Sequence, residues 1–157
     1  MASVNVGDLA PDFELEGTHG PFSLAALLGE RIVLLFYPGD DTTVCTKQFC
    51  SYRDDDADMS ALKAKVVGIS TGTVGSKEAF TAKHGLKTEL LADEDGAVAE
   101  RYGIYAKRLG MAKRTVFIVD EHGRIAHKHG NLLSLGFDDV GALKSALDKL
   151  PAAQPVR

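Results

Sequence analysis

Three short, uninterrupted apolar runs constrain the fold of this chain more than any other feature of its sequence. The runs are rich in β-branched or aromatic residues, and polar or turn residues bound each of them: Ile32–Tyr37, Val66–Ile69 and Val116–Val119. Runs of this kind are typical of strands that are buried on both faces of a sheet. We therefore expect these three segments to form the centre of one sheet.

Segments with a helical spacing of apolar residues lie between and after the expected strands. They predict four helices, over Thr43 to about Lys63, Ser76–Lys83, Glu94–Tyr102 and Asp138–Leu150. In the last of these, Val140, Leu143 and Leu147 fall on one face, which is the pattern of a helix packed against a core. Strands that alternate with helices predict an α/β domain around a mixed central sheet.

Two more strands are expected outside this alternation. Asp120–Gly123 has the composition of a turn that leads into an edge strand over Arg124–Lys128, and Phe13–Gly17 looks like an added strand followed by a hairpin turn. The chain has 157 residues, and no Ser/Gly-rich linker or internal repeat divides it. A chain of this length is near the usual size of one domain and can bury a sizeable core. We expect a single domain over residues 1–157.

The charge, the first residues and the cysteine content argue against several classes of function. A formal net charge of −4 argues against nucleic acid or an anionic membrane as the main partner. The first residues have neither a basic start nor an apolar run, and no apolar stretch approaches the roughly 20 residues that span a bilayer, so we expect a cytoplasmic protein. Two cysteines are too few for a four-thiolate zinc site, and His127 and His129 have no third ligand nearby. We expect no metal and no other cofactor.

The segment with the most specific chemistry begins where the first buried strand ends. Pro38 stops that strand, and Asp41, Thr42 or Thr43 can each cap a following helix. With any of these caps, Cys45 lies in or just before the first helical turn, where unpaired N–H groups and the positive end of the helix dipole meet. This environment favours thiolate over thiol, and such junctions are where ligand clefts form in α/β sheets. Cys45 is therefore a candidate nucleophile.

The second cysteine, Cys50, follows five residues later. In an ideal helix the two Cα atoms would be about 8.6 Å apart on nearly opposite sides, whereas a disulfide needs less than roughly 7 Å. Cys45 and Cys50 therefore cannot bridge while the helix is intact, and we infer that the helix must unwind locally if they react. The alternatives are two inert buried thiols, or an unreactive Cys50 in an enzyme that an external thiol resolves.

The spacing Pro38-x-x-x-Thr42-x-x-Cys45 resembles the active-site motif of the peroxiredoxins. With a second cysteine at position 50, the chain is similar to the branch called bacterioferritin comigratory protein or peroxiredoxin Q. The resemblance covers nearly the whole chain and includes three further segments: Gly7–Phe13, Val67–Ser70 and Lys113–Asp120. Each motif alone is weak, but together they are highly specific.

This resemblance implies a thioredoxin-like fold and a thiol-dependent peroxidase that reduces hydrogen peroxide and organic hydroperoxides in antioxidant defence. Cys45 would be the peroxidatic cysteine, which becomes a sulfenic acid, and Cys50 the resolving cysteine, which closes an intramolecular disulfide. Thr42 would place its hydroxyl beside the thiolate, Arg114 would bring a fixed positive charge, and Pro38 would shield the site from water. A thioredoxin-type dithiol would recycle the enzyme, which we expect to be a monomer or a weak homodimer.

The chain departs from the branch pattern before and after the candidate nucleophile. Thr43 and Val44 stand where the branch commonly has Pro-Gly, which affects how readily the loop unwinds, and Gln48 changes the hydrogen bonding near the site. Neither departure removes a reacting group.

Two other functions stay open on the sequence alone. A disulfide reductase or isomerase of the same fold predicts Cys-x-x-Cys at the helix start, but Gln48 occupies the place of its second cysteine. A catalytically silent binding module would keep the fold, yet it would have no reason to retain Thr42, Cys45 and Arg114 together. If neither residue takes part in catalysis, Arg114 is an ordinary charge at the end of a strand and Thr42 only caps the helix.

Overall fold

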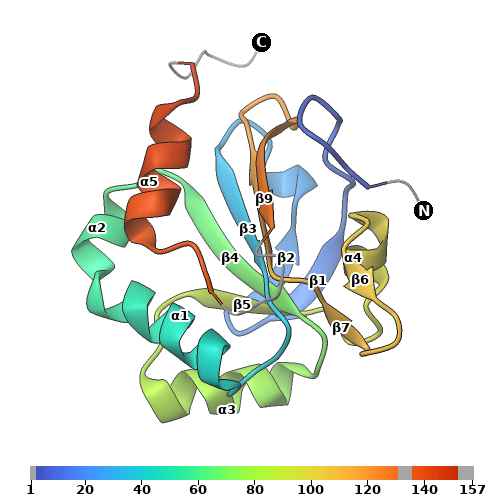
Figure 1. Ribbon diagram of the computed structural model, residues 1–157, viewed down its shortest axis with the longest axis vertical. Helices are drawn as coiled ribbons and strands as arrows, with labels where there is room; N and C mark the ends of the chain where they lie inside the picture. Colours follow the sequence, from blue (N-terminus) through green and yellow to red (C-terminus); the bar gives the residue numbers. More distant parts are fainter. Residues whose placement is uncertain (1–2, 131–135, 152–157) are drawn as a thin grey trace.

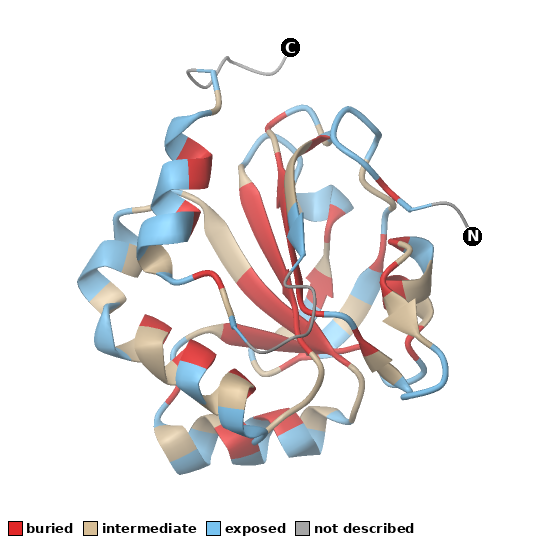
Figure 2. Ribbon diagram, in the orientation of Figure 1, coloured by how far each residue is buried: buried red, intermediate tan, exposed pale blue. Residues whose placement is uncertain are grey.

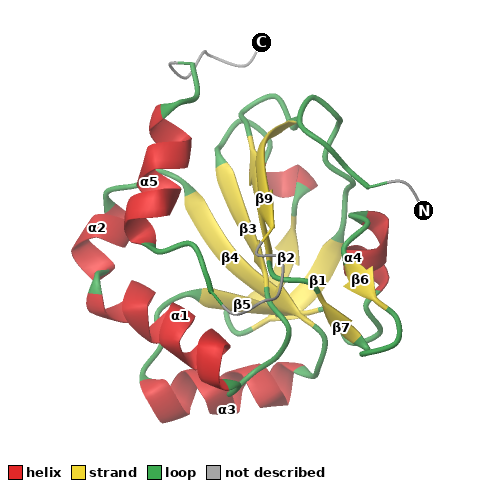
Figure 3. Ribbon diagram, in the orientation of Figure 1, coloured by secondary structure: helices red, strands yellow, loops and turns green. Residues whose placement is uncertain are grey.

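The computed structural model describes residues 3–130 and 136–151, and within these ranges it forms a seven-stranded mixed sheet with helices against both faces (Figure 1; Figure 3). The strand order is β2-β1-β5-β4-β3-β8-β9. The strands are β1 (Glu14–Gly17), β2 (Gly20–Ser23), β3 (Ile32–Phe36), β4 (Lys65–Ser70), β5 (Glu89–Ala92), β8 (Thr115–Val119) and β9 (Ile125–Gly130). The central β3, β4 and β5 are parallel, whereas β1 pairs antiparallel with β5, and β8 with β3. The predicted mixed sheet and N-terminal hairpin are confirmed.

Two groups of helices cover the two faces of this sheet. The helices are α1 (Thr43–Asp54), α2 (Asp56–Ser60), α3 (Val74–His84), α4 (Ala97–Arg101), α5 (Val140–Asp148) and a 3-10 turn over Ala25–Leu27. Helices α1, α3 and α5 pack on one face, and α4 packs on the other, next to a small hairpin of β6 (Tyr105–Ala106) and β7 (Met111–Ala112) (Figure 1). The sheet is thus a middle layer between two apolar cores.

The central strands are buried on both faces, as their sequences predict (Figure 2). All five residues of β3 and all five of β8 are buried. In β3, Val33 and Leu35 belong to the core under α1, α3 and α5, while Leu34 and Phe36 belong to the opposite core. Successive side chains of a strand point to opposite faces, so a continuous apolar run is needed to fill both cores.

Several boundaries differ from the expected ones for local reasons. The helix that starts at Thr43 ends at Asp54 because Asp55 leaves helical geometry (φ −100°, ψ 34°), and α2 continues after this break. Helix α4 is shorter than expected because Gly96, its N-cap, takes a left-handed conformation (φ 75°). The strands β5, β6 and β7 had no clear sequence signal, since two of them are only two residues long and β5 starts with the charged Glu89.

Over the described ranges, no helix is long and apolar enough to cross a membrane.

A close approach of α1 to the sheet determines where the candidate nucleophile lies. Gly68 of β4 faces Phe49 of α1, and a Cβ atom at Gly68 would lie 2.9 Å from Phe49 Cζ and 2.8 Å from Leu90 Cδ2. Only glycine leaves room for this contact. Because Phe49 sits one turn after Cys45, its packing also holds the first turn of α1 against the end of β3.

Candidate active site

The candidate nucleophile, Cys45, is the third residue of α1. Of the three caps that the sequence allows, the structure uses Thr42, whose backbone is extended and whose side-chain oxygen accepts a hydrogen bond from the Cys45 backbone N–H at 3.4 Å. The Cys45 side chain has no exposed surface. Cys45 therefore lies in the first turn of the helix, as predicted, and its side chain is shielded from bulk water.

Arg114 brings a positive charge directly to this sulfur. Its Nη2 atom donates to Cys45 Sγ at 3.0 Å, its Nη1 atom donates to Gln48 Oε1, and the whole side chain is 2% exposed. The register of the sheet explains the contact. Strands β3 and β8 are antiparallel with Phe36 opposite Thr115, so the residue before β8 lies beside the residues that follow β3.

A buried chain of hydrogen bonds holds the partner of Arg114 in place. Gln48 Nε2 donates to the Tyr52 hydroxyl at 3.0 Å, and that hydroxyl donates to the backbone carbonyl of Asp138. Burial raises the pKa of Tyr52, so its hydroxyl stays protonated and can donate. Because the amide nitrogen of Gln48 is used in this way, its amide oxygen is turned toward Arg114. From the sequence, Gln48 is expected to change the hydrogen bonding near the site, but its connection to the segment before α5 is not predictable.

The remaining loop residue of the predicted site, Pro38, lines a cavity of about 610 Å³ together with Thr42 and Arg114. Leu109 and Met111, from the hairpin segment next to α4, form part of its apolar wall. Cys45 is not among the lining residues and has no exposed surface. A ligand in this cavity therefore does not contact the sulfur in this conformation.

The second cysteine is not brought to the first. Cys50 is partly buried, both cysteines are free thiols, and α1 is continuous from Thr43 to Asp54. In a continuous helix, residues five positions apart have Cα atoms about 8.6 Å apart, which is too far for a disulfide. The structure thus has the intact-helix geometry in which the two cysteines cannot react.

A charged cluster next to the site had no signal in the sequence. Lys77 of α3 is fully buried, and its ammonium lies 3.2 Å from Asp40 Oδ2 and 2.6 Å from Ser70 Oγ. Tyr37 donates to the same aspartate at 2.6 Å. Lysines on surface helices are almost always exposed, so no pattern in the sequence distinguishes Lys77 from its neighbours.

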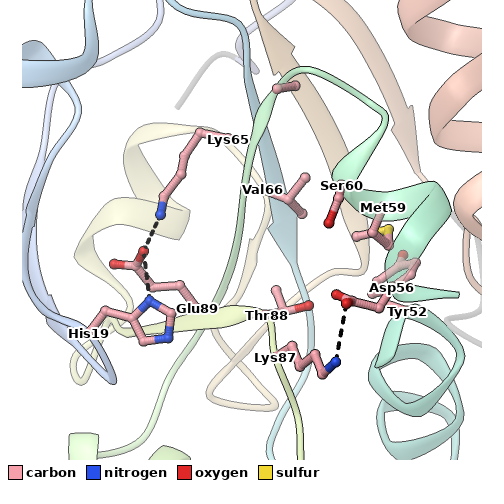
Figure 4. Close-up of a pocket in the computed structure, with 11 residues that line it drawn as sticks. His19, Tyr52, Asp56, Met59, Ser60, Lys65, Val66, Lys87, Thr88 and Glu89 are labelled. Carbon is pink, nitrogen blue, oxygen red and sulfur yellow. Dashed lines mark hydrogen bonds and ion pairs between the residues drawn. The ribbon is translucent and has the colours of Figure 1, made fainter. Parts of the chain in front are cut away.

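A separate surface pocket carries no comparable chemistry (Figure 4). Its cationic groups are already paired: Lys65 lies 2.6 Å and His19 3.5 Å from Glu89, and Lys87 lies 3.1 Å from Asp56. No cysteine lines it. In the described ranges, no three His, Cys, Asp or Glu side chains gather as a metal site would require.

Comparison with known proteins identifies the family of this chain. The model of the AhpC/TSA family matches residues 6–128. A putative peroxiredoxin bcp of Coxiella burnetii is 38% identical over 131 residues, which are 79% of this chain and 87% of that protein. The chloroplastic peroxiredoxin Q of Arabidopsis thaliana is 37% identical over 133 residues, which are 83% of this chain and 62% of that protein.

A solved structure agrees with these sequence relatives. The crystal structure of peroxidoxin BcpB from Mycobacterium tuberculosis shares 30% sequence identity with this chain at a TM-score of 0.81, and the match covers 95% of this chain and 99% of that one. This chain therefore belongs to the AhpC/TSA family and, within it, to the peroxiredoxins of the Bcp and Q kind, which are thiol-dependent peroxidases with a thioredoxin-like fold.

Proposed function

We propose that this chain reduces hydrogen peroxide and organic hydroperoxides by oxidising Cys45 to a sulfenic acid, as part of antioxidant defence. The observation that carries the proposal is the 3.0 Å contact between Arg114 Nη2 and Cys45 Sγ at the first turn of α1. A guanidinium stays protonated at every physiological pH, and a buried guanidinium is stable only beside an anion. Arg114 therefore lies where it stabilises negative charge on the sulfur, the form in which a cysteine is nucleophilic.

The first step is an in-line attack of this thiolate on one oxygen of the peroxide. A sulfur–oxygen bond forms, the O–O bond breaks, and the sulfur loses two electrons to become a sulfenic acid. The departing oxygen leaves as alkoxide or hydroxide and takes up a proton to become an alcohol or water. Donors that surround the developing charge stabilise it: Arg114, the Thr42 hydroxyl and the free N–H groups of the first helical turn.

Pro38 closes the loop side of the cavity and limits the entry of water to the reacting atoms. Because Cys45 has no exposed surface, a small movement of the loop before α1 must open the way for the peroxide. Water exclusion after closure strengthens the interaction of Arg114 with the developing charge.

The second step is the attack of Cys50 on the sulfenic acid. The Cys50 sulfur forms a disulfide with Cys45 as its thiol gives up a proton, the sulfur–oxygen bond breaks, and the departing oxygen takes up that proton and leaves as water. The continuous geometry of α1 requires that its first turns unwind for this reaction. A thioredoxin-type dithiol then supplies two electrons and two protons and becomes a disulfide itself, which restores both thiols of the enzyme.

The relatives support a location for the reaction, and the reacting groups support an oligomeric state. Bacterial relatives named Bcp support a cytoplasmic protein, where thioredoxin-type dithiols keep thiols reduced. We propose that the chain works as a monomer or a weak homodimer, because every group that the reaction needs comes from one copy.

Peroxide consumption by the reduced protein tests this function. We expect one equivalent of hydrogen peroxide or an organic hydroperoxide to disappear rapidly with wild type, and no rapid loss with Cys45→Ser. Mass spectrometry after one turnover should find a Cys45–Cys50 disulfide in wild type and a Cys45 sulfenic acid in Cys50→Ser. Equal peroxide loss with Cys45→Ser would overturn the role of Cys45, and a stable sulfenic acid in wild type would overturn the role of Cys50.

A further inference from the structure

A fully buried lysine lies beside the active-site loop, and the proposed reaction gives it no role. Lys77 of α3 has no exposed side-chain surface. Its ammonium donates to Ser70 Oγ at 2.6 Å and to the Thr71 carbonyl at 3.2 Å, and it lies 3.2 Å from Asp40 Oδ2. Lysine is almost never fully buried unless it is paired, so the carboxylate of Asp40 is what makes this burial possible.

Asp40 connects this lysine to the start of α1. Its carboxylate accepts from the Tyr37 hydroxyl at 2.6 Å and from the Ser76 hydroxyl at 2.7 Å, as well as from Lys77, and it is only 7% exposed. Asp40 precedes by two residues Thr42, the N-cap of α1. The ion pair therefore fastens α3 to the loop from which the first helical turn begins.

We propose that Lys77 is a positioning residue: its buried ion pair with Asp40 holds the loop before α1, and so controls how readily α1 unwinds to bring Cys45 and Cys50 together. This inference rests on the proposed function, since it assigns Lys77 a part in the same reaction. The first turn of α1 keeps its place only if its cap does, and the cap lies directly after the fastened loop.

The negative charge of Asp40 also helps to keep the buried Lys77 protonated. Burial lowers the pKa of Lys77, and the negative charge of Asp40 opposes this shift, with smaller contributions from Asp93 and Cys45.

The fate of the Cys45 sulfenate reports on this unwinding. In one reaction, a second peroxide gives a sulfinate: another sulfur–oxygen bond forms, the O–O bond breaks, and the peroxide becomes an alcohol or water. In the other, Cys50 forms the disulfide and water leaves. Only the second reaction needs an unwound α1. Because both reactions with peroxide need the same opening of the loop before α1, the rate of sulfenic acid formation is measured in parallel to account for peroxide access. At a fixed peroxide concentration and an equal rate of that first step, the ratio of disulfide to sulfinate measures how readily the helix opens.

Lys77→Met tests the inference, because it removes the charge and keeps an unbranched side chain of similar length. The loss of a hydrogen bond to a charged group changes an equilibrium constant by about 10-fold or more. We therefore expect the unwinding of α1 to become easier and the ratio of disulfide to sulfinate to rise about 10-fold. The full-length protein is mixed with peroxide, quenched, and its disulfide and sulfinate forms are counted by mass spectrometry. The matched control is Lys83→Met on the same helix: Lys83 lies 2.7 Å from Asp41 but is 61% exposed, and exposed ion pairs contribute little.

An unchanged or smaller ratio in Lys77→Met would overturn the inference, and so would an equal rise in Lys83→Met. If Lys77→Met does not fold, the double variant Lys77→Met/Asp40→Asn carries the test, because it leaves no unpaired charge buried; a wild-type ratio there would overturn the inference as well. If wild type forms the disulfide and the variants show the same ratio of disulfide to sulfinate as wild type, only the proposed role of Lys77 is refuted. If wild type forms no disulfide, the proposed role of Cys50 itself is refuted.

Discussion

Replacement of Arg114 by methionine tests the central contact of the site. The change removes the donor that lies 3.0 Å from Cys45 Sγ and leaves a shorter, uncharged and unbranched side chain in a position that is 2% exposed. A hydrogen bond to a charged group contributes about 1.5–3 kcal/mol. Since each 1.4 kcal/mol is a factor of about 10 in rate, we expect Arg114→Met to slow the reaction of Cys45 with peroxide by about 10- to 150-fold.

The assay separates the chemical step from later steps. A single turnover of the reduced protein with peroxide, followed by stopped flow, gives the second-order rate constant of sulfenic acid formation directly. The ultraviolet absorbance of the thiolate at neutral pH reports in parallel how much of the sulfur is ionised. We expect both to decrease in Arg114→Met, and Arg114→Lys to give an intermediate rate because it keeps the charge but not the fork of donors.

The matched control for this prediction is Lys113→Met, which removes the same charge from the neighbouring, exposed position. It should react at close to the wild-type rate, because an exposed charge is screened by solvent. If Arg114→Met kept the wild-type rate constant and thiolate absorbance, the buried guanidinium would not be what holds the sulfur ionised. An equal slowing in Lys113→Met would show that net charge, rather than the contact, matters.

Two further predictions concern stability. Tyr52→Phe leaves Gln48 and the Asp138 carbonyl without their buried partner. We therefore expect the free energy of unfolding in urea to fall by about 1–3 kcal/mol. An unchanged free energy would exclude an energetic role for this hydrogen-bonded connection. Burial lowers the pKa of His127 despite the nearby Asp138 carboxylate, so in acid the unfolded chain binds a proton more readily than the folded chain. Stability should therefore fall as the pH drops below about 6.5, the unfolded value, and His127→Gln should lose less over this range than wild type; parallel pH profiles of the two proteins would contradict this.

Local features of the fold were predictable because they depend on residues that are close in the chain. The runs Ile32–Tyr37 and Val116–Val119 match β3 and β8 to within one residue at each end, since a strand buried on both faces must be apolar throughout. The helix start at Thr43 also follows from the cap formed by Thr42. The break at Asp55 and the strands β6 and β7 were not predictable, because a single backbone angle and two-residue pairings leave no periodic pattern.

By itself, then, the sequence determined that Cys45 would stand at the beginning of a helix that follows a buried strand. Four consecutive positions, from Thr42 to Cys45, contain the hydrogen bond that does this. The neighbours of the sulfur were decided only by the tertiary structure. Arg114 lies 69 positions away and Lys77 acts on Asp40 from 37 positions away, and both arrive through the packing of the sheet and of α3. Contacts of this kind depend on strand register and helix placement, which are properties of the whole folded chain rather than of any segment.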